Sequence, residues 1–327
     1  MLAAVLYRFG RPLRLENRPR PRTRGEQVLV RVRGAGVCHS DVHMADGEFA
    51  GVRLPLVPGH EVAGEVPEMG PVLVYASWGC GRCQWCRQGD EQLCPDGLDA
   101  GWTADGGYAE WMVVPSRRYL IPLGDLDPVR AAPLADAGVT PYRAVRRALP
   151  WLEGGGPAVV IGVGGLGQFA IQYLRLLAGA RVAAVDRNPS KLAVARGLGA
   201  DTAVLPRDAR RLPPARAVFD FVGSRATLAL GARLLQPGGI LVQVGAAGGH
   251  LPFGFDTVPS EAHLTTSVWG SMRELSEVVD LARQGKITWH VETLPLAQVN
   301  EALRRVRRGQ VRGRLVLVPQ SDTATRH

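Results

Sequence analysis

The chain has 327 residues, more than one hydrophobic core usually supports, so its length predicts two domains. Its formal net charge of +9 would suit a nucleic-acid-binding protein, but the arginines are spread along the whole chain, which favours a solvated basic surface instead. Arg175 and Arg181 interrupt the most apolar region, and the first ten residues do not resemble a signal peptide. These features predict a cytoplasmic protein that binds neither nucleic acid nor membrane.

Up to about residue 137 the sequence predicts short β-strands separated by turns. Residues 28–33 alternate valine with leucine or arginine, which is the period of a strand with one buried face. The first part of the chain is therefore expected to be rich in β-structure.

Four of the five cysteines lie between about residues 78 and 96, with the spacing C-x2-C-x2-C-x7-C. Two disulfides would need an oxidising compartment, whereas four thiolates at this spacing can surround one zinc ion. Because four thiolates complete a tetrahedron, this zinc would be structural and would keep no position open for a substrate. The predicted ligands are Cys80, Cys83, Cys86 and Cys94.

The fifth cysteine indicates a second metal site. Cys38 begins the segment Cys38-His39-Ser40-Asp41, and His60 follows in Gly59-His60-Glu61. Cysteine sulfur and histidine nitrogen are both common zinc ligands. We therefore expect a second metal centre in the first half of the chain.

Beyond residue 137 the sequence changes to alternating strands and helices, which predicts an α/β domain with a doubly wound parallel sheet. Asn188-Pro189 supplies the N-cap and first-turn proline of one helix. Ser271 and Glu274 form the capping box of another helix, which Gly285 ends. The expected strands cover residues 158–161, 181–186, 217–222 and 240–244.

A glycine-rich turn joins the first of these strands to its helix. Gly162, Gly164 and Gly167 follow the pattern G-x-G-x-x-G, which permits a tight turn and close approach of the backbone to a pyrophosphate. Asp186 ends the next strand, where a carboxylate can accept hydrogen bonds from an adenosine ribose. The pattern predicts binding of NAD in preference to NADP, although the neighbouring Arg187 weakens that preference.

Six motifs follow one another along the chain: Cys38-His39-Ser40-Asp41, Gly59-His60-Glu61-Val62-Ala63-Gly64, the four-cysteine lobe, Asp105-Gly106-Gly107-Tyr108-Ala109-Glu110, Ala137-Gly138-Val139-Thr140-Pro141-Tyr142 and Gly162-Val163-Gly164-Gly165-Leu166-Gly167. In this order they resemble the zinc-dependent alcohol dehydrogenases of the medium-chain dehydrogenase/reductase family, and above all the bacterial secondary-alcohol dehydrogenases. The resemblance implies a GroES-like catalytic domain at residues 1–137, a Rossmann domain at 138–268 and a return of residues 269–327 to the catalytic domain. It further implies hydride transfer between a small alcohol or ketone and NAD, two zinc ions per chain, and a dimer or tetramer.

The same resemblance assigns roles around the catalytic zinc. Cys38, His60 and Asp136 match its three protein ligands, with aspartate where a second cysteine is usual. Glu61 matches a carboxylate that can bind the metal transiently. Asp41 matches the acid that orients the ligand histidine.

Other positions match residues for proton transfer, cofactor binding and substrate binding. The released proton is expected to leave through Ser40 and then His43. Trp269 matches a bulky pocket wall, which favours an apolar secondary alcohol over a polyol. Besides the glycines and Asp186, the expected cofactor contacts are His39, Thr140, Gly165, Leu166, Arg187, Lys191, Val244, Gly245, Ser267, Val268 and Arg314.

Two segments, residues 65–79 and 203–217, are shorter than the resemblance implies, which indicates either deleted loops or residues missing from the given chain.

Two other functions stay open. A zinc-free quinone or enoyl reductase of the same superfamily would lack the ligand set of Cys38, His60 and Asp136. A zinc-stabilised nucleic-acid-binding protein would not need the nucleotide-binding pattern.

Overall fold

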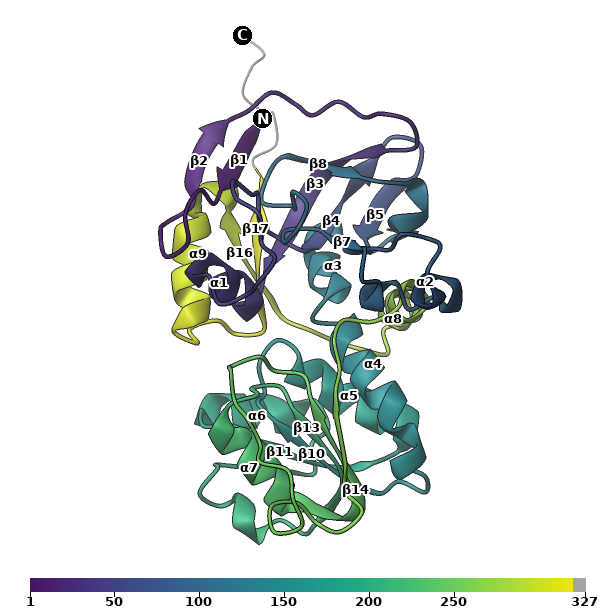
Figure 1. Cartoon of the computed structure of the whole chain (residues 1–327), viewed down its shortest axis with the longest axis vertical. Coiled ribbons are helices and arrows are strands. Elements are labelled where there is room, and N and C mark those ends of the chain that lie inside the picture. Colours follow the sequence, from purple (N-terminus) through teal and green to yellow (C-terminus); the bar gives the residue numbers. More distant parts are fainter. Residues whose placement is uncertain (320–327) are drawn as a thin grey trace. The chain divides into compact units, whose positions relative to one another are not determined.

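The computed structural model describes residues 1–319 and divides the chain into two compact units (Figure 1). The first unit contains Met1–Asp136 together with the residues from Ser271 onward, and the second contains Ala137–Gly270. The second unit is thus one uninterrupted segment of the chain, inserted into the first. No helix among the described residues is long and apolar enough to cross a membrane.

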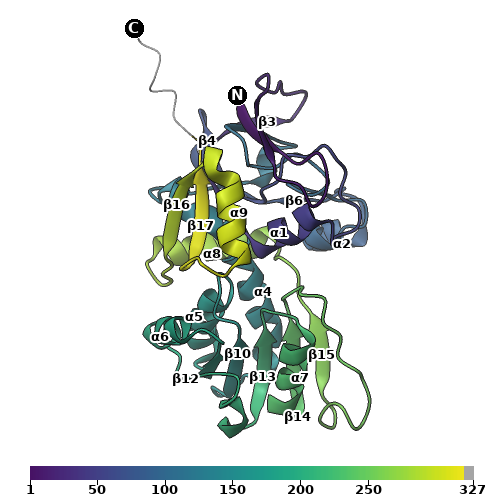
Figure 2. The same cartoon turned by 90° about the vertical axis from the view of Figure 1, so that its left-hand side faces the viewer.

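A seven-stranded sheet forms the centre of the first unit, with the order β16-β17-β3-β4-β5-β9 and with β8 paired to β3. Its long strand β3 shows the alternating burial that residues 28–33 predict. The strand β17 lies beside β16 (Figure 2) and pairs antiparallel with β3 on its other side, with Leu315 opposite Val37. The strands are β3 (Val28–Val37), β4 (Glu61–Val66), β5 (Gly70–Val74), β8 (Trp111–Val114), β9 (Leu120–Pro122), β16 (Val291–Pro295) and β17 (Arg314–Val318).

Short helices and a small hairpin surround this sheet. The helix α1 begins directly after β3, so the residue between them is held at a fixed place at the end of the strand. Ser271 and Glu274 form the predicted capping box of α8. The remaining elements are β1 (Leu2–Val5), β2 (Arg14–Asn17), α1 (His39–Asp46), α3 (Pro128–Ala131), the 3-10 helices η2 (Arg117–Tyr119), η3 (Ala132–Ala135) and η6 (Leu296–Gln298), α8 (Met272–Arg283) and α9 (Val299–Arg307).

The four-cysteine segment forms a lobe of its own in the first unit. The lobe contains β6 (Ser77–Trp78), α2 (Gln84–Gln88), η1 (Glu91–Leu93) and β7 (Leu98–Asp99). These elements are very short, and none of the residues of α2 is buried. Packing alone therefore gives this lobe little stability, and a cross-link between its cysteines would supply the rest.

The second unit contains the predicted doubly wound sheet, with six parallel strands in the order β12-β11-β10-β13-β14-β15. The strand order reverses between β10 and β13, which places a crevice at the carboxyl ends of these strands. Asn188 caps α6 as predicted, since its side chain accepts a hydrogen bond from the backbone of Ser190. The elements are α4 (Val139–Ala148), η4 (Leu149–Trp151), β10 (Pro157–Ile161), α5 (Gly167–Ala178), β11 (Arg181–Val185), α6 (Pro189–Gly197), β12 (Thr202–Val204), η5 (Ala209–Arg211), β13 (Ala215–Asp220), α7 (Arg225–Leu234), β14 (Leu235–Gln243) and β15 (His263–Thr266).

Both unusually short segments connect their strands without distortion. Between β4 and β5 the turn closes with a 3.0 Å hydrogen bond from the backbone of Met69 to that of Val66. Between β12 and β13 a single 3-10 helix, η5, replaces a longer helical crossover. Each connection is thus closed by the residues that the chain has, and deletion of a longer loop stays one of the two predictions for these segments.

Candidate active site

Three potential metal ligands from distant parts of the sequence converge inside the first unit. Cys38 lies between β3 and α1, His60 directly precedes β4, and Asp136 directly follows η3. All three are buried. Asp136 Oδ2 lies 3.5 Å from Cys38 Sγ and 3.5 Å from His60 Nε2. Zinc bonds of 2.0–2.3 Å at tetrahedral angles would separate such ligand atoms by about 3.5 Å, so the residues fit a zinc ion.

Asp41 contacts two of these ligands, Cys38 and His60. Its Oδ2 accepts hydrogen bonds from the backbone of Cys38 at 2.8 Å and from the hydroxyl of Tyr108 at 2.9 Å. Its Oδ1 lies 3.2 Å from Nδ1 of His60. Burial and the nearby Asp41 raise the pKa of Tyr108 well above its usual value, so this hydroxyl stays a donor. The position agrees with the orienting role that the resemblance implies for Asp41.

The imidazole of His60 binds a proton firmly in the absence of metal. Burial lowers the pKa of His60, but the charge of Asp41 and the hydrogen bonds of the imidazole to Asp136, Asp41 and Cys38 more than offset it, so the pKa is raised well above 6.5. A metal ion binds the neutral imidazole, so zinc has to displace a proton at this site.

Glu61 and Arg314 form a buried ion pair beside the three ligands. Nε of Arg314 lies 3.0 Å from both carboxylate oxygens of Glu61. Burial raises the pKa of Glu61 to about 7, although the charge of Arg314 opposes the shift. A Cβ atom on Gly36 would lie 1.8 Å from Glu61 Oε2, so only glycine at position 36 gives this carboxylate its room. The sequence assigned Arg314 to the cofactor, and the structure places its guanidinium against the metal-ligand set.

The two residues expected to carry protons lie on α1. Ser40 and His43 are both partly exposed. Nδ1 of His43 lies 2.7 Å from Oε2 of Glu48, which follows the end of α1. Glu48 was not predicted from the sequence, because it lies beyond the end of α1 and outside the motifs.

Two aromatic rings extend from the candidate metal site. The ring of Trp102 lies 5.0 Å from that of His60, and the ring of Phe49 lies 5.6 Å from that of Trp102, measured between centroids. Both aromatic residues are half-buried. The sequence analysis missed these residues too, because Phe49 and Trp102 become neighbours only when their loops fold against His60.

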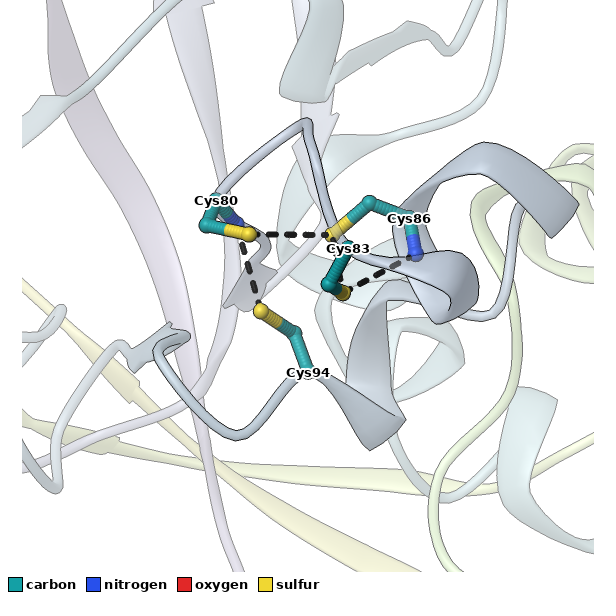
Figure 3. A group of neighbouring side chains, drawn as sticks. All are labelled: Cys80, Cys83, Cys86 and Cys94. Carbon is teal, nitrogen blue, oxygen red and sulfur yellow. Dashed lines mark hydrogen bonds between the residues drawn. The ribbon is translucent and has the colours of Figure 1, made fainter.

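The four lobe cysteines gather around one point, with their sulfur atoms within 4.8 Å of one another (Figure 3). Cys86 Sγ lies 3.5 Å from Cys83 Sγ and 4.0 Å from Cys80 Sγ, close to the separation of about 3.8 Å that four zinc–sulfur bonds would give. Hydrogen bonds from the backbone of Arg82 and Cys83 lower the pKa of Cys80 to about 6. The residues therefore fit a structural zinc ion.

The glycine-rich turn of the second unit leaves its backbone open for a ligand. A Cβ atom on Gly167 would lie 1.9 Å from the carbonyl oxygen of Gly162, so this glycine packs α5 against the turn. At Gly164 a Cβ atom would meet no other atom within 4 Å, which leaves space at the N-terminus of α5. Asp186 is buried, and its carboxylate accepts a 2.8 Å hydrogen bond from the backbone of Val163. This arrangement fits a dinucleotide.

The other expected cofactor contacts lie in loops, at strand ends and in three helices, with His39 in α1, Thr140 in α4 and Lys191 in α6. Val244 and Gly245 directly follow β14, and both of their backbone N–H groups donate to the carbonyl of Asp220. Trp269 has a positive φ of 41°, which is unusual for a bulky residue. Among the remaining positions, Thr140 and Ser267 are buried, Gly165, Leu166 and Lys191 are half-buried, and His39, Arg187 and Val268 are exposed.

The fold and the two sites define a class: a dehydrogenase that joins a zinc-binding β-domain to a dinucleotide-binding domain. The alcohol dehydrogenase GroES-like domain matches residues 24–125, and the zinc-binding dehydrogenase domain matches residues 165–284. The chain belongs to the zinc-dependent alcohol dehydrogenases of the medium-chain dehydrogenase/reductase family. As predicted, it is an oxidoreductase that transfers hydride between an alcohol and NAD.

Relatives match nearly the whole chain. An alcohol dehydrogenase of Geobacillus stearothermophilus is 35% identical over 98% of this chain and 100% of its own, and the alignment covers 349 positions, more than this chain has residues. A D-arabinose 1-dehydrogenase (NADP+) of Saccharolobus solfataricus is 37% identical over 97% of both chains. The crystal structure of an alcohol dehydrogenase from Aeropyrum pernix matches with a TM-score of 0.91, 37% identity and coverage of 98% of this chain and 100% of that chain. This family membership argues against the nucleic-acid-binding alternative.

Proposed function

We propose that the protein oxidises apolar secondary alcohols to ketones with NAD and catalyses the reverse reduction, with Cys38, His60 and Asp136 holding the catalytic zinc. The observation that carries the substrate class is the aromatic wall of Trp102 and Phe49 beside His60. Such rings exclude water and favour an apolar group next to the reacting carbon. A polyol would lose hydrogen bonds to water against the same rings.

The side chains of the site supply orientation and proton transfer. Zinc bound by the three ligands supplies a Lewis acid that stabilises negative charge on a substrate oxygen, and NAD supplies the hydride acceptor. Ser40 lies two residues after Cys38, and His43 lies one turn further along α1 on the same face. This spacing supports a relay in which Ser40 takes the substrate proton and passes it toward His43.

A substrate panel tests the proposed class. Zinc-replete protein is assayed by NADH absorbance with a series of 2-alkanols, with primary alcohols, with sorbitol and with D-arabinose, the substrate named for one relative. We expect the highest kcat/KM on a 2-alkanol of medium length, and Trp102→Ala to lower it by about tenfold, the loss of roughly 1–3 kcal/mol of apolar contact. Highest activity on sorbitol or D-arabinose would overturn the proposal.

A variant of Trp269 tests the pocket wall that the sequence alone indicates. Trp269→Ala should change the relative kcat/KM values along the 2-alkanol series, because an aromatic wall limits the length of the bound alkyl group. A substrate profile identical to that of the wild type would remove Trp269 from the pocket.

We also propose that NAD is preferred to NADP. The support is the buried carboxylate of Asp186 at the end of β11, which would repel a 2′-phosphate. The ratio of kcat/KM for the two cofactors measures this preference, and Asp186→Ala should reduce it by leaving Arg187 free to meet a phosphate. Equal use of both cofactors by the wild type would contradict the argument.

The assembly is proposed to be a dimer or tetramer. The strand β15 is an open edge of its sheet, and Leu264 on that strand is 36% exposed. Phe253 and Phe255, in the preceding loop, are 76% and 100% exposed. Light scattering during size-exclusion chromatography measures the mass, and a monomer at micromolar concentration would refute this part.

We place the protein in the cytoplasm, where a reducing environment keeps the lobe thiols available for zinc.

A further inference from the structure

We propose that Arg314 is a positioning residue for Asp136, holding the carboxylate of the third metal ligand in place. This inference rests on the proposed function of Cys38, His60 and Asp136 as a zinc site. It goes further because it explains why aspartate can serve as the ligand at position 136: Arg314, 178 positions later in the chain, holds its carboxylate.

The geometry connects the two residues directly. The NH2 group of Arg314 donates to Oδ2 of Asp136 at 3.1 Å, the same oxygen that lies 3.5 Å from Cys38 Sγ and from His60 Nε2. The side chain of Arg314 is 7% exposed and that of Asp136 is 9% exposed. Water therefore has little access to this contact, and the interaction between the two charges is weakly screened.

Arg314 is itself held at both ends of its side chain, with the guanidinium bound to Glu61 and the backbone bound to His290. Its Nε is 3.0 Å from both oxygens of Glu61, whose side chain is fully buried. The backbone N–H of Arg314 donates at 3.0 Å to His290, which fixes the first residue of β17. A forked guanidinium that is anchored in this way can meet a second carboxylate only along a narrow set of directions. Arg314 therefore limits the orientation of Asp136.

Aspartate needs such a partner more than cysteine does. Each carboxylate oxygen has two lone pairs, so Oδ2 of Asp136 can bind a metal and still accept a hydrogen bond from Arg314, whereas a thiolate sulfur is a weak acceptor. An isolated buried carboxylate would also carry an uncompensated charge next to the thiolate of Cys38 and the carboxylate of Glu61. The positive charge of Arg314 compensates it. The pair should thus be matched: Arg314 should support a metal ligand at position 136 only when that ligand is aspartate.

A double-mutant cycle with Arg314→Gln and Asp136→Cys tests this coupling. The dissociation constant of the catalytic zinc is measured by competition with a chelator, and the lobe zinc serves as the internal control. In the Asp136 background, Arg314→Gln should weaken catalytic zinc binding by about 10- to 100-fold, the usual effect of losing a group that orients a ligand. In the Asp136→Cys background the same change should cost less than about threefold.

Two outcomes would overturn the inference alone. One is an unchanged zinc affinity in Arg314→Gln. The other is an equal loss of zinc affinity in the Asp136 and Asp136→Cys backgrounds, which would mean that Arg314 acts through Glu61 or on the cofactor. A wild-type protein that binds only the lobe zinc would instead overturn the proposed function itself. Arg314→Lys keeps the positive charge but lacks the planar guanidinium with its several N–H donors. It therefore replaces Arg314→Gln in the double-mutant cycle if that variant fails to fold. The absorption spectrum of the Co2+-substituted protein should shift in the Arg314 variants only when position 136 is aspartate.

Discussion

Glu48 shows how a residue outside every motif can act on the proposed relay. Its carboxylate lies 2.7 Å from Nδ1 of His43. This contact holds the imidazole ring of His43 in one orientation relative to α1. Glu48 is 55% exposed, so its influence is screened by solvent.

We expect Glu48→Gln to lower kcat/KM by about two- to fivefold, because the contact with His43 is exposed and such pairs contribute about 0–1 kcal/mol. Ser40→Ala is the matched comparison and should lower kcat/KM by about 100-fold or more. Steady-state assays under the same conditions measure both values. An unchanged kcat/KM in Glu48→Gln would exclude this carboxylate from the proposed relay.

His60 makes the binding of catalytic zinc dependent on pH. The pKa of its imidazole is raised above 6.5 in the metal-free protein, so the ring is protonated below that raised value and has to release a proton to bind zinc. Zinc affinity should therefore increase as the pH rises, and level off with respect to His60 once the pH exceeds the raised pKa. Calorimetry in buffers of different ionisation enthalpy measures the released proton. Binding without proton release at pH 6 would contradict this argument.

At the scale of single elements, two glycines near the start of α5 have different roles: Gly167 packs the helix against the turn, and Gly164 leaves space for a ligand. Gly167→Ala would bring Cβ within 1.9 Å of the Gly162 carbonyl, so it should lower the free energy of unfolding by about 1–3 kcal/mol. Gly164→Ala meets no neighbouring atom and should leave stability unchanged, but its methyl group would occupy the space expected for the pyrophosphate. We expect NAD affinity to fall by about tenfold or more in Gly164→Ala.

Denaturant unfolding and titration with NAD separate the two effects. If Gly164→Ala binds NAD as tightly as the wild type does, the cofactor does not approach the turn at this glycine. A Gly167→Ala variant of normal stability would mean that α5 can move away from the turn at little cost.

The cysteine lobe should depend on its metal for stability and not for chemistry. Metal analysis should find two zinc ions per chain, and Cys94→Ser should reduce this number to one. Because the lobe elements are short and α2 has no buried residue, we expect this loss to lower the midpoint of thermal unfolding by roughly 5 °C or more, corresponding to about 2 kcal/mol. Cys38→Ser should instead remove the other zinc and abolish turnover. Wild-type protein with at most one zinc after supplementation would refute the two-site assignment.

At the scale of the whole molecule, local signals in the sequence account for most of the fold. Asn188 and Ser271 cap the helices that they were predicted to cap, and the glycine turn lies between the expected strand and helix. Capping and turn formation depend on residues a few positions apart, which a sequence displays directly.

Most of the contacts that the sequence did not predict join distant parts of the chain, and the contact of Glu48 with His43 is the short-range exception. Trp102 meets Phe49 and His60 only after three loops fold together, and Arg314 reaches Asp136 across 178 positions. No periodicity or spacing encodes such a pair, because its partners are selected by tertiary packing. The ligand positions themselves were predicted from motif order, which carries information about distant contacts that single residues lack.

The position of β17 has a consequence for the time at which the metal site forms during synthesis. Cys38, His60 and Asp136 leave the ribosome early, but Arg314 begins a strand close to the end of the chain. At about 5–20 residues per second, roughly 10–35 s pass between the synthesis of Asp136, the last of the three ligands, and that of Arg314. Over that interval the inserted segment Ala137–Gly270 is complete and free to fold by itself. We therefore expect the nucleotide-binding domain of a newly made chain to form before its zinc centre is complete.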